Sequence, residues 1–335
     1  MRISYSALDR FKECPTKYYL AKKWQSVEKS SALFFGTVVE DGINELLSGE
    51  TLERAFSVFE ANWTEQPPTK FSPKPTPIYD NPNVVYYASD RDEKLLTKED
   101  WDEIDSWEDL EEQQLDNRIS WLCCLRRGFG MIQAFYDEVF PEIEEVVYLQ
   151  KEISLKNADG DEATGYIDLI AKLKGKKKPL ILDIKTAASP YGDHKIDTSD
   201  QLRLYSHAEK IDEVGYIVLV KKPIYTTKCD SCGHERKAGS SAKNCTECKK
   251  TLKGKYTIRI PKFYTQLIHK KTTKAERESL IDDAVDIVTA IKNEIKWKNP
   301  NSCENFNKKC EFYDSCWKNK KLEDLEHLES KGIKK

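Results

Sequence analysis

Apolar side chains recur along this chain with two different periods. Spacings of three and four residues predict helices over residues 4–24, 36–47, 118–140 and 274–297, with a further helix beginning near Asp200. Short apolar runs bounded by glycine, proline and lysine predict strands over residues 146–155, 165–173, 180–185, 214–222 and 256–263. The pattern therefore indicates an α/β protein.

The composition is that of a folded domain. Of the 335 residues, 39% are hydrophobic and 33% are charged, which allows a real core and argues against wholesale disorder. The sequence contains no run of 18 apolar residues, the length that would predict a membrane-spanning helix, and the N-terminus lacks the apolar region of a secretory signal. We therefore expect a cytoplasmic protein that does not bind a membrane.

Charge is concentrated in two segments, although the net charge is only −3. Residues 90–117 carry 13 acidic against 3 basic side chains; we interpret them as a solvated helix face or loop, with partner binding or duplex mimicry as the alternative. Residues 221–255 carry 10 basic against 3 acidic side chains. Binding of a nucleic acid would have to depend on such a local basic patch.

Two carboxylates and a lysine stand at the ends of two neighbouring predicted strands. Asp168 ends the run Gly165-Tyr-Ile-Asp, and Asp183 and Lys185 end the next run two residues apart, so they share one face. Carboxylates that converge at strand ends make an oxygen site suited to magnesium or manganese, and a lysine beside it can stabilise charge on a phosphate. The alternative for Asp183 and Lys185 alone is an ion pair on an edge strand.

Three further side chains fit such a site. Glu40 lies on the helix predicted over residues 36–47 and is a candidate third metal ligand. Gln201 and Tyr205 are four residues apart, so they lie on one face of the helix that follows. We expect them to contact the scissile strand or Lys185.

At these residues the chain resembles the PD-(D/E)XK nuclease superfamily. Within it, the sequence is similar to the RecB-like branch, which includes the CRISPR-associated RecB-like exonucleases and the AddB nuclease domain. The matching residues follow the family order over nearly the whole chain: Ser6, Cys14-Pro15, Tyr18-Tyr19, Gly36 to Glu40, Gly165 to Asp168, Asp183 to Lys185, Gln201, Tyr205 and the C-terminal cysteines. Many members carry histidine at the position of Glu40, and other branches carry glutamate.

The resemblance implies a metal-dependent deoxyribonuclease. Asp168, Asp183 and Glu40 would bind magnesium or manganese, and Lys185 would position the attacking water or stabilise the transition state. The substrate strand would be positioned by Gln201 and Tyr205. The resemblance also suggests an exonuclease, encoded by a phage or its host. It would act on single-stranded DNA or free DNA ends in replication, recombination, repair or CRISPR adaptation, with protein partners in such a complex.

A non-catalytic alternative is a DNA-binding or assembly subunit that keeps a nuclease fold. Loss of Lys185 or of either aspartate would mark such a degenerate copy, and all three residues are present. The residues therefore favour the enzyme.

Four cysteines from the two ends of the chain are candidates for a shared site. Cys303, Cys310 and Cys316 need a fourth ligand to close a thiolate site, and Cys14 is the one cysteine in the first hundred residues. Spacing alone leaves iron, zinc and free cysteines open. The resemblance implies a structural [4Fe-4S] cluster that joins the N-terminal helix to the C-terminal segment.

A second set of cysteines has the spacing of a zinc ribbon. Cys229 and Cys232 form one C-x-x-C pair, Cys245 and Cys248 form another, and 12 residues separate the pairs. Two such pairs complete a tetrahedral zinc site, with disulfides as the alternative. The site lies at the tip of the hairpin predicted from strands 214–222 and 256–263. Its basic surroundings make it a candidate contact for the DNA backbone; the alternative is a metal that only folds a long loop.

The expected fold is α/β, with a restriction-endonuclease-like core in which helices flank a mixed central sheet. An inserted zinc ribbon with four cysteine ligands and an iron-sulfur-stapled terminal region are added to this core. The expected parts are an N-terminal helical region at 1–140, a nuclease core at 141–222 and 256–300, the ribbon at 223–255, and a cluster-binding segment and tail at 301–335.

Overall fold

The structure is a computed structural model, and it describes residues 1–26, 29–66, 76–77, 79, 84–107, 110–156, 160–229, 231–237, 244–245, 247–250, 259–305, 308–318 and 325–327. The α-helices are α1 (Tyr5–Glu13), α2 (Pro15–Ala21), α3 (Ser31–Leu47), α4 (Leu52–Thr64), α5 (Lys98–Asp105), α6 (Glu112–Glu138), α7 (His194–Asp197), α8 (Asp200–Glu209), α9 (Lys274–Lys292) and α10 (Tyr313–Lys318). Single 3₁₀ turns are η2 (Glu93–Leu95), η3 (Phe140–Glu142) and η4 (Pro300–Ser302). No helix in these ranges is both long and apolar enough to cross a membrane.

Six strands form the central sheet: β1 (Arg2–Ser4), β7 (Ile143–Lys156), β8 (Glu162–Leu173), β9 (Leu180–Ala187), β10 (Glu213–Val220) and β14 (Thr265–Lys271). A three-stranded sheet contains β11 (Ile224–Lys228), β12 (Glu235–Lys237) and β13 (Arg259–Lys262). Short two-stranded pairings involve β2 (Trp24–Ser26), β3 (Lys29–Ser30), β4 (Glu65–Gln66), β5 (Thr76–Pro77), β6 (Val84–Val85), β15 (Glu304–Asn305), β16 (Lys308–Lys309) and β17 (Leu325–His327).

The central sheet is mixed and is forked in its middle. Its order is β1-β8-β9-β10-β14, with β7 on the other side of β8; β1–β8 and β9–β10 are parallel, and the remaining pairs are antiparallel. Strand β9 pairs with residues 169–171 of β8, whereas β1 pairs with residues 162–164. Residues 165–168 therefore lie at a fork where β9 leaves β8 and β1 takes its place. The mixed sheet with flanking helices fits the expected restriction-endonuclease-like fold.

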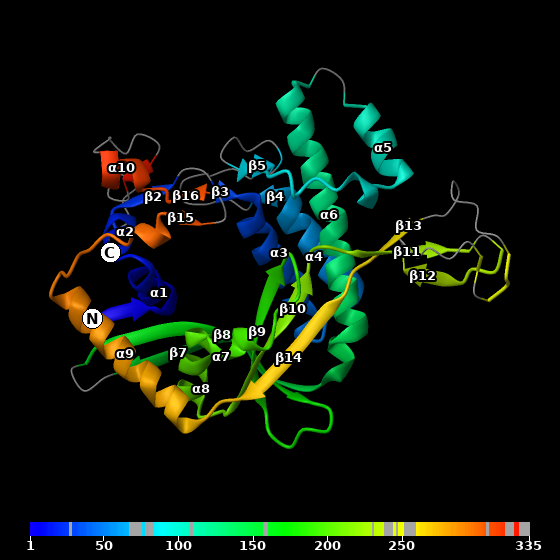
Figure 1. Ribbon diagram of the computed structural model, residues 1–335. Coiled ribbons are helices and arrows are strands. Elements are labelled where there is room, and N and C mark those ends of the chain that lie inside the picture. The colour runs from blue at the N-terminus through cyan, green and yellow to red at the C-terminus, as the bar shows by residue number, and fades with distance from the viewer. Residues whose placement is uncertain are drawn as a thin grey trace.

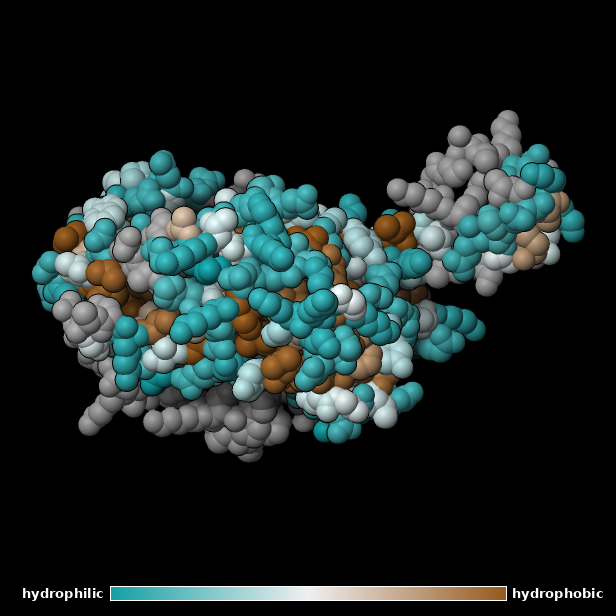
Figure 2. All heavy atoms as spheres, turned by 90° about the horizontal axis from the view of Figure 1, so that it is seen from below, coloured by the Kyte–Doolittle hydropathy of each residue, from teal (hydrophilic) through white to brown (hydrophobic). Residues whose placement is uncertain are grey.

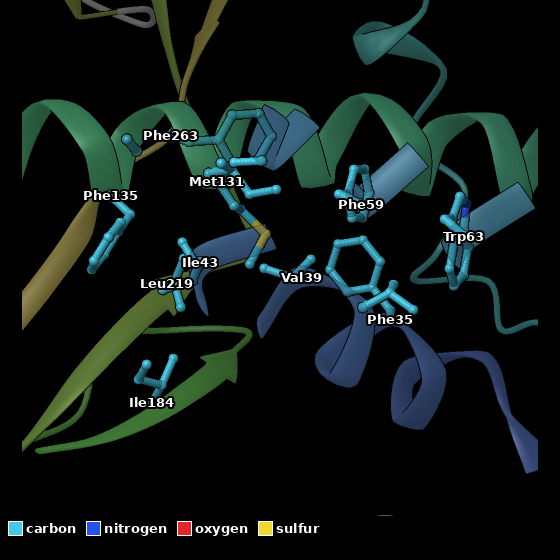
Figure 3. Packing of buried hydrophobic residues seen from close by; sticks show 14 of the residues in the cluster. Phe35, Val39, Ile43, Phe59, Trp63, Met131, Phe135, Ile184, Leu219 and Phe263 are labelled. Atoms are coloured by element: carbon cyan, nitrogen blue, oxygen red, sulfur yellow. The ribbon is translucent and has the colours of Figure 1, made fainter. Parts of the chain in front are cut away.

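Helices cover both faces of the sheet (Figure 1). On one face, α3, α4 and α6 bury a core against β8, β9 and β10. Figure 3 shows Phe35 and Val39 of α3 facing Phe59 of α4, with Met131 of α6 above Ile184 of β9. Each such side chain contributes about 1.5–3 kcal/mol on burial, so this layer fixes α3 on the sheet. On the other face α8 packs on the strands, and α1 packs on α9.

The first predicted helix is broken, and the break positions a cysteine. We expected one helix over residues 4–24, but α1 ends at Glu13 and α2 begins at Pro15. Proline lacks a backbone N–H and disfavours helical dihedrals in the preceding residue, and Cys14 is accordingly extended, with φ −163° and ψ 111°. Cys14 therefore lies between two helices. Likewise, the last predicted helix ends at Lys292 rather than at residue 297.

The predicted hairpin of strands 214–222 and 256–263 pairs differently. Strand β10 pairs with β14, a strand that the pattern missed, whereas β11 pairs with β13 and β12. The strand TQLIHKK of β14 is too polar to register as an apolar run. Together β11, β12 and β13 carry the C-x-x-C pairs and form an arm. Figures 1 and 2 both show this arm extending away from the body.

Candidate active site

The site is built at the fork, and its most buried member is Asp183 of β9. Asp183 Oδ2 lies 2.6 Å from Lys185 Nζ, because residues two apart on a strand share a face. The Asp183 side chain is 1% exposed, and apart from this ion pair neither carboxylate oxygen accepts a hydrogen bond within the described residues. Burial raises the pKa of Asp183 above its ordinary value, which the positive charge of Lys185 partly offsets. Burial acts in the opposite sense on Lys185, but Asp183 and Asp168 raise the pKa of its ammonium overall.

Asp168 of β8 stands at the point where the strands separate. The β8–β9 ladder stops at the pair Leu169 and Leu182, and the next N–H along that edge of β9, from Ile184, donates to Asp168 Oδ2 at 2.8 Å. The carboxylate thus replaces a strand partner and is held beside Asp183. Burial raises the pKa of Asp168 also, while Lys185 lowers it.

Glu40 reaches this pair of aspartates from α3. The helix approaches the sheet closely at Gly36, where an added Cβ would lie 3.2 Å from Thr186 Oγ1 of β9. Burial, together with the negative charge of Asp168, raises the pKa of Glu40 to about 7, and a hydrogen bond from Gln150 opposes this shift. That bond joins Gln150 Nε2 to Glu40 Oε1 at 2.8 Å.

Gln201 and Tyr205 lie on one face of α8, as the spacing predicted. Gln201 Nε2 donates to the Tyr205 hydroxyl at 2.8 Å, and burial raises the pKa of Tyr205 to about 12. The Tyr205 ring covers Gly165 of β8 so closely that an added Cβ would lie 3.1 Å from a ring carbon. Gly165 is therefore the residue that lets Tyr205 approach the strand bearing Asp168.

The structure brings Glu40, Asp168, Asp183, Lys185, Gln201 and Tyr205 to one end of the fork. Oxygen ligands suit a divalent cation such as magnesium or manganese. A buried carboxylate without enough hydrogen-bond donors is costly unless positive charge accompanies it. Asp183 is such a group, and the one lysine beside it also faces the charges of Asp168 and Glu40. The chemistry of these carboxylates therefore suits a divalent metal, although oxygens of Glu40, Asp168 and Asp183 do not all lie within 4.8 Å of one another, so the three would have to draw closer around an ion.

Sequence reasoning missed two residues beside the site. Gln150 contacts Glu40 from β7, and a lone glutamine in a strand carries no signal for that contact. Tyr191 follows β9 in a loop, where Gln266 of β14 holds its backbone by two hydrogen bonds: Tyr191 N–H donates to Gln266 Oε1 at 2.8 Å, and Gln266 Nε2 donates to Tyr191 O at 3.0 Å. The Tyr191 ring also meets Tyr216 edge to face at 5.3 Å. Because β14 was not predicted, neither was this loop anchor.

The arm holds a four-cysteine group that could bind a metal ion. The sulfur atoms of Cys229, Cys232, Cys245 and Cys248 all lie within 4.8 Å of one another. The Cys229–Cys248 and Cys232–Cys245 sulfurs are 3.6 and 3.7 Å apart, well beyond the length of a disulfide bond.

Both C-x-x-C pairs form tight knuckles of the same kind. Backbone N–H groups of Ser231 and Cys232 donate to the Cys229 sulfur and lower the pKa of that thiol to about 7. In the second pair, Cys248 and Glu247 donate in the same way to Cys245 and lower its pKa. Thiolates are the metal-binding form of cysteine, so the local backbone prepares Cys229 and Cys245 to be ligands, whereas the neighbouring sulfurs raise the pKa of Cys232 to about 11.

The terminal cysteines meet in one pocket. Cys14 lines it together with Cys303, Cys310 and Cys316. Lys17 and Lys298 line the same pocket and can balance the charge of thiolates. No three of these four sulfur atoms lie within 4.8 Å of one another, so the set is more open than the four cysteines of the arm.

Comparisons with known proteins identify the family of this chain. A model of the PD-(D/E)XK nuclease superfamily matches residues 2–316. A search of curated proteins gave no match. Among solved structures, a candidate exonuclease from Eubacterium rectale is 13% identical, covers 96% of this chain and 89% of its own, and has a TM-score of 0.40. The structure of SSO0001 is 13% identical, covers 55% of this chain and 67% of its own, and has a TM-score of 0.23. The family match spans nearly the whole chain, and the chain therefore belongs to the PD-(D/E)XK nuclease superfamily and is a nuclease.

Proposed function

We propose that this nuclease is a magnesium- or manganese-dependent deoxyribonuclease of the RecB-like branch, acting as an exonuclease on single-stranded DNA or on free DNA ends. The observation that carries the proposal is the buried Asp183, which lies next to Asp168 and 2.6 Å from Lys185 and has no other hydrogen-bond donor in the described chain. Two carboxylates and one lysine at a strand fork supply the charges that phosphodiester hydrolysis requires.

In this proposal Asp168 and Asp183 hold the metal, with Glu40 as a further ligand. When bound, the metal lowers the pKa of a water and neutralises charge on the phosphate. The Lys185 ammonium stays protonated, because its carboxylate neighbours raise its pKa. It can therefore hold the attacking water by hydrogen bonding and stabilise the negative charge that develops on the phosphate oxygens.

Gln201 and Tyr205 position the substrate strand in the same proposal. Their mutual hydrogen bond fixes the Gln201 amide at the edge of the site, and the raised pKa keeps the Tyr205 hydroxyl protonated as a donor at neutral pH. Both groups can then bind phosphate or sugar oxygens next to the scissile bond.

The terminal cysteines would hold a structural [4Fe-4S] cluster. Each thiolate of such a cluster binds a different iron, so the sulfur atoms lie farther apart than around a single zinc ion. The open arrangement of Cys14, Cys303, Cys310 and Cys316 in one pocket favours the cluster over zinc.

The arm would hold zinc. Four sulfurs around one tetrahedral zinc at about 2.3 Å are about 3.8 Å apart, close to the 3.6 and 3.7 Å seen here. Because residues 221–255 carry 10 basic against 3 acidic side chains and the arm extends from the body, we propose that it contacts the DNA backbone (Figure 2).

The proposed setting is replication, recombination, repair or CRISPR adaptation, within a protein complex and in a phage or its host. The proposed division of the chain is a helical region at 1–140, the nuclease core at 141–222 and 256–300, the ribbon at 223–255 and the cluster segment at 301–335.

Cleavage of end-labelled substrates tests the proposal. Anaerobically purified protein is incubated with single-stranded DNA, duplex DNA and RNA of one sequence, in magnesium, manganese or EDTA. We expect metal-dependent cleavage of DNA and a product ladder that starts at an end. Cleavage of RNA alone, or cleavage that persists in EDTA, would contradict the proposal. Binding of DNA without cleavage would replace it by a non-catalytic assembly subunit.

A further inference from the structure

One residue beside the site has an unusual backbone conformation, shortly after a register shift in strand β7 between Val146 and Tyr148. Within the described residues, four non-glycine residues have positive φ: Gln150, Lys210, Lys249 and Glu294. Lys210 follows α8, Glu294 follows α9, and Lys249 follows a C-x-x-C knuckle, all positions where left-handed residues are common. Gln150, with φ 49°, instead lies in the middle of strand β7. This conformation is disfavoured for a residue with a side chain.

Packing does not account for the strained conformation of Gln150. Its side chain is exposed, so it contributes little to the core. A strained residue that persists without a packing role is a candidate for a role in function.

Gln150 connects two carboxylates of the proposed site. In the β7–β8 ladder Leu149 faces Leu169 and Lys151 faces Ile167, so Gln150 lies opposite Asp168. Its side chain leaves β7 and donates to Glu40 Oε1 on α3, at 2.8 Å. The left-handed backbone thereby aims an amide from the strand facing Asp168 at the carboxylate of Glu40.

Glu40 needs such a donor if it is to stay near Asp168. The two carboxylates repel each other, and burial further disfavours the charged form of Glu40. Without a donor, the Glu40 side chain would turn away from Asp168 toward water. The Gln150 amide offsets the repulsion by binding one oxygen, and it leaves the other oxygen to serve as a ligand.

We propose that Gln150 is a positioning residue, which orients Glu40 as a ligand of the divalent metal. The inference rests on the proposed function, since it assigns Gln150 to the same metal site. Gln150 itself does not touch the reacting atoms in this account.

Metal binding to the whole protein, measured without substrate, tests the proposal. Manganese is titrated into protein that has no metal bound at the fork, and the concentration of free manganese is followed by electron paramagnetic resonance. Binding that disappears in Asp183→Ala identifies the site at the fork. Gln150→Gly removes the amide and accepts positive φ, so its thermal midpoint should equal or exceed that of the wild type. We expect its manganese affinity to fall about 10- to 100-fold, as for other residues that orient ligands.

Glu294→Gly is the matched control. Glu294 has φ 52° at the end of α9, so this variant relieves the same kind of strain outside the site. It should bind manganese as the wild type does. Gln150→Asn keeps an amide on a shorter side chain and should recover part of the affinity.

The outcomes separate this inference from the proposed function. Gln150→Gly with wild-type manganese affinity would overturn the positioning role, and so would a lowered thermal midpoint, because Gln150 would then be structural. If the wild-type protein shows no manganese binding that is lost in Asp183→Ala, the proposed metal site itself would be overturned.

Discussion

The fork and the arm both gather candidate metal ligands, but they do so in opposite ways. The fork collects Glu40, Asp168 and Asp183 from α3, β8 and β9, and it buries Asp183 almost completely. The arm collects its four cysteines from residues 229–248, in two knuckles whose own backbone N–H groups donate to the sulfurs. The fork therefore depends on the whole fold, whereas the arm depends on local turns. The arm can lose its structure while the fork stays intact.

The terminal cysteine pocket stands between these two cases. Three of its cysteines are close in sequence, whereas Cys14 lies far earlier in the chain, at the break between α1 and α2. The position of Cys14 in this pocket depends on the fold, whereas the other three cysteines depend on a local segment. A cluster there would tie the two ends of the chain together.

The largest effect should come from removing charge at the fork without removing a hydrogen bond. In Asp168→Asn the amide oxygen can still accept from Ile184 N–H, so the fold should persist while a metal-binding charge is lost. We expect cleavage to fall about 1000-fold. Metal analysis should find the zinc content of the arm unchanged. Loss of zinc together with activity would mean that the two regions are not independent.

Breaking the terminal pocket should cost stability. Cys14→Ser removes the candidate ligand that would close a loop of nearly the whole chain; a disulfide that closes a loop stabilises by about 2–4 kcal/mol, and we expect a loss of that order. We expect loss of iron and of visible absorbance, with a lower midpoint of denaturant unfolding. Zinc in place of iron in the wild-type protein would contradict the proposed cluster.

Removing zinc from the arm should weaken DNA binding and spare the chemistry. Cys245→Ser breaks one knuckle, so we expect loss of zinc and weaker binding with a shallower dependence on salt, because fewer phosphates are contacted. Cleavage of saturating DNA should change by less than about 3-fold, since the fork is intact. His234→Ala is the control: it lies next to the first knuckle and is not among the four cysteines, so zinc should be retained.

The smallest effect should come from the base of the arm. The Tyr225 hydroxyl of β11 donates to Asp92 Oδ2 at 2.8 Å, and Lys94 Nζ lies 5.7 Å from the Tyr225 ring. Tyr225→Phe removes the hydrogen bond, worth about 1 kcal/mol. We expect faster hydrogen exchange in β11 and β13, with unchanged exchange in β9. Faster exchange at β9 as well would show that the arm and the fork are coupled.

The carboxylates and the lysine of the fork could be singled out because each lies beside an apolar run of the sequence. We expected Asp168 and Asp183 at strand ends, whereas they lie within β8 and β9, at the point where the two strands separate; the hairpin itself follows from the turn between the two apolar runs. The knuckles of the arm could be predicted for a similar reason, since C-x-x-C spacing is itself a structural motif. The break at Cys14 was predictable from Pro15, but the apolar spacing on both sides led us to expect one helix.

The contacts between distant segments could not be predicted. The left-handed backbone of Gln150 carries no sequence signal, since glutamine has no preference for positive φ. Strand β14 lies at the edge of the sheet and is polar along much of its length, so the apolar pattern missed it. Without β14, we expected strand 214–222 to pair with strand 256–263, whereas β10 pairs with β14. The loop anchor formed by Tyr191 and Gln266 depends on that strand and was lost with it.

The central claim is that Lys185 acts on the phosphodiester at a metal site formed by Asp168 and Asp183. Single-turnover cleavage of end-labelled DNA by Lys185→Ala tests it, with Lys172→Ala as the matched control. Lys172 also lies on a strand of the central sheet and pairs with a carboxylate, Glu144, at 3.1 Å. We predict a loss of at least about 100-fold for Lys185→Ala and none for Lys172→Ala, with DNA binding retained in both. Equal cleavage by Lys185→Ala and the wild type would contradict the account.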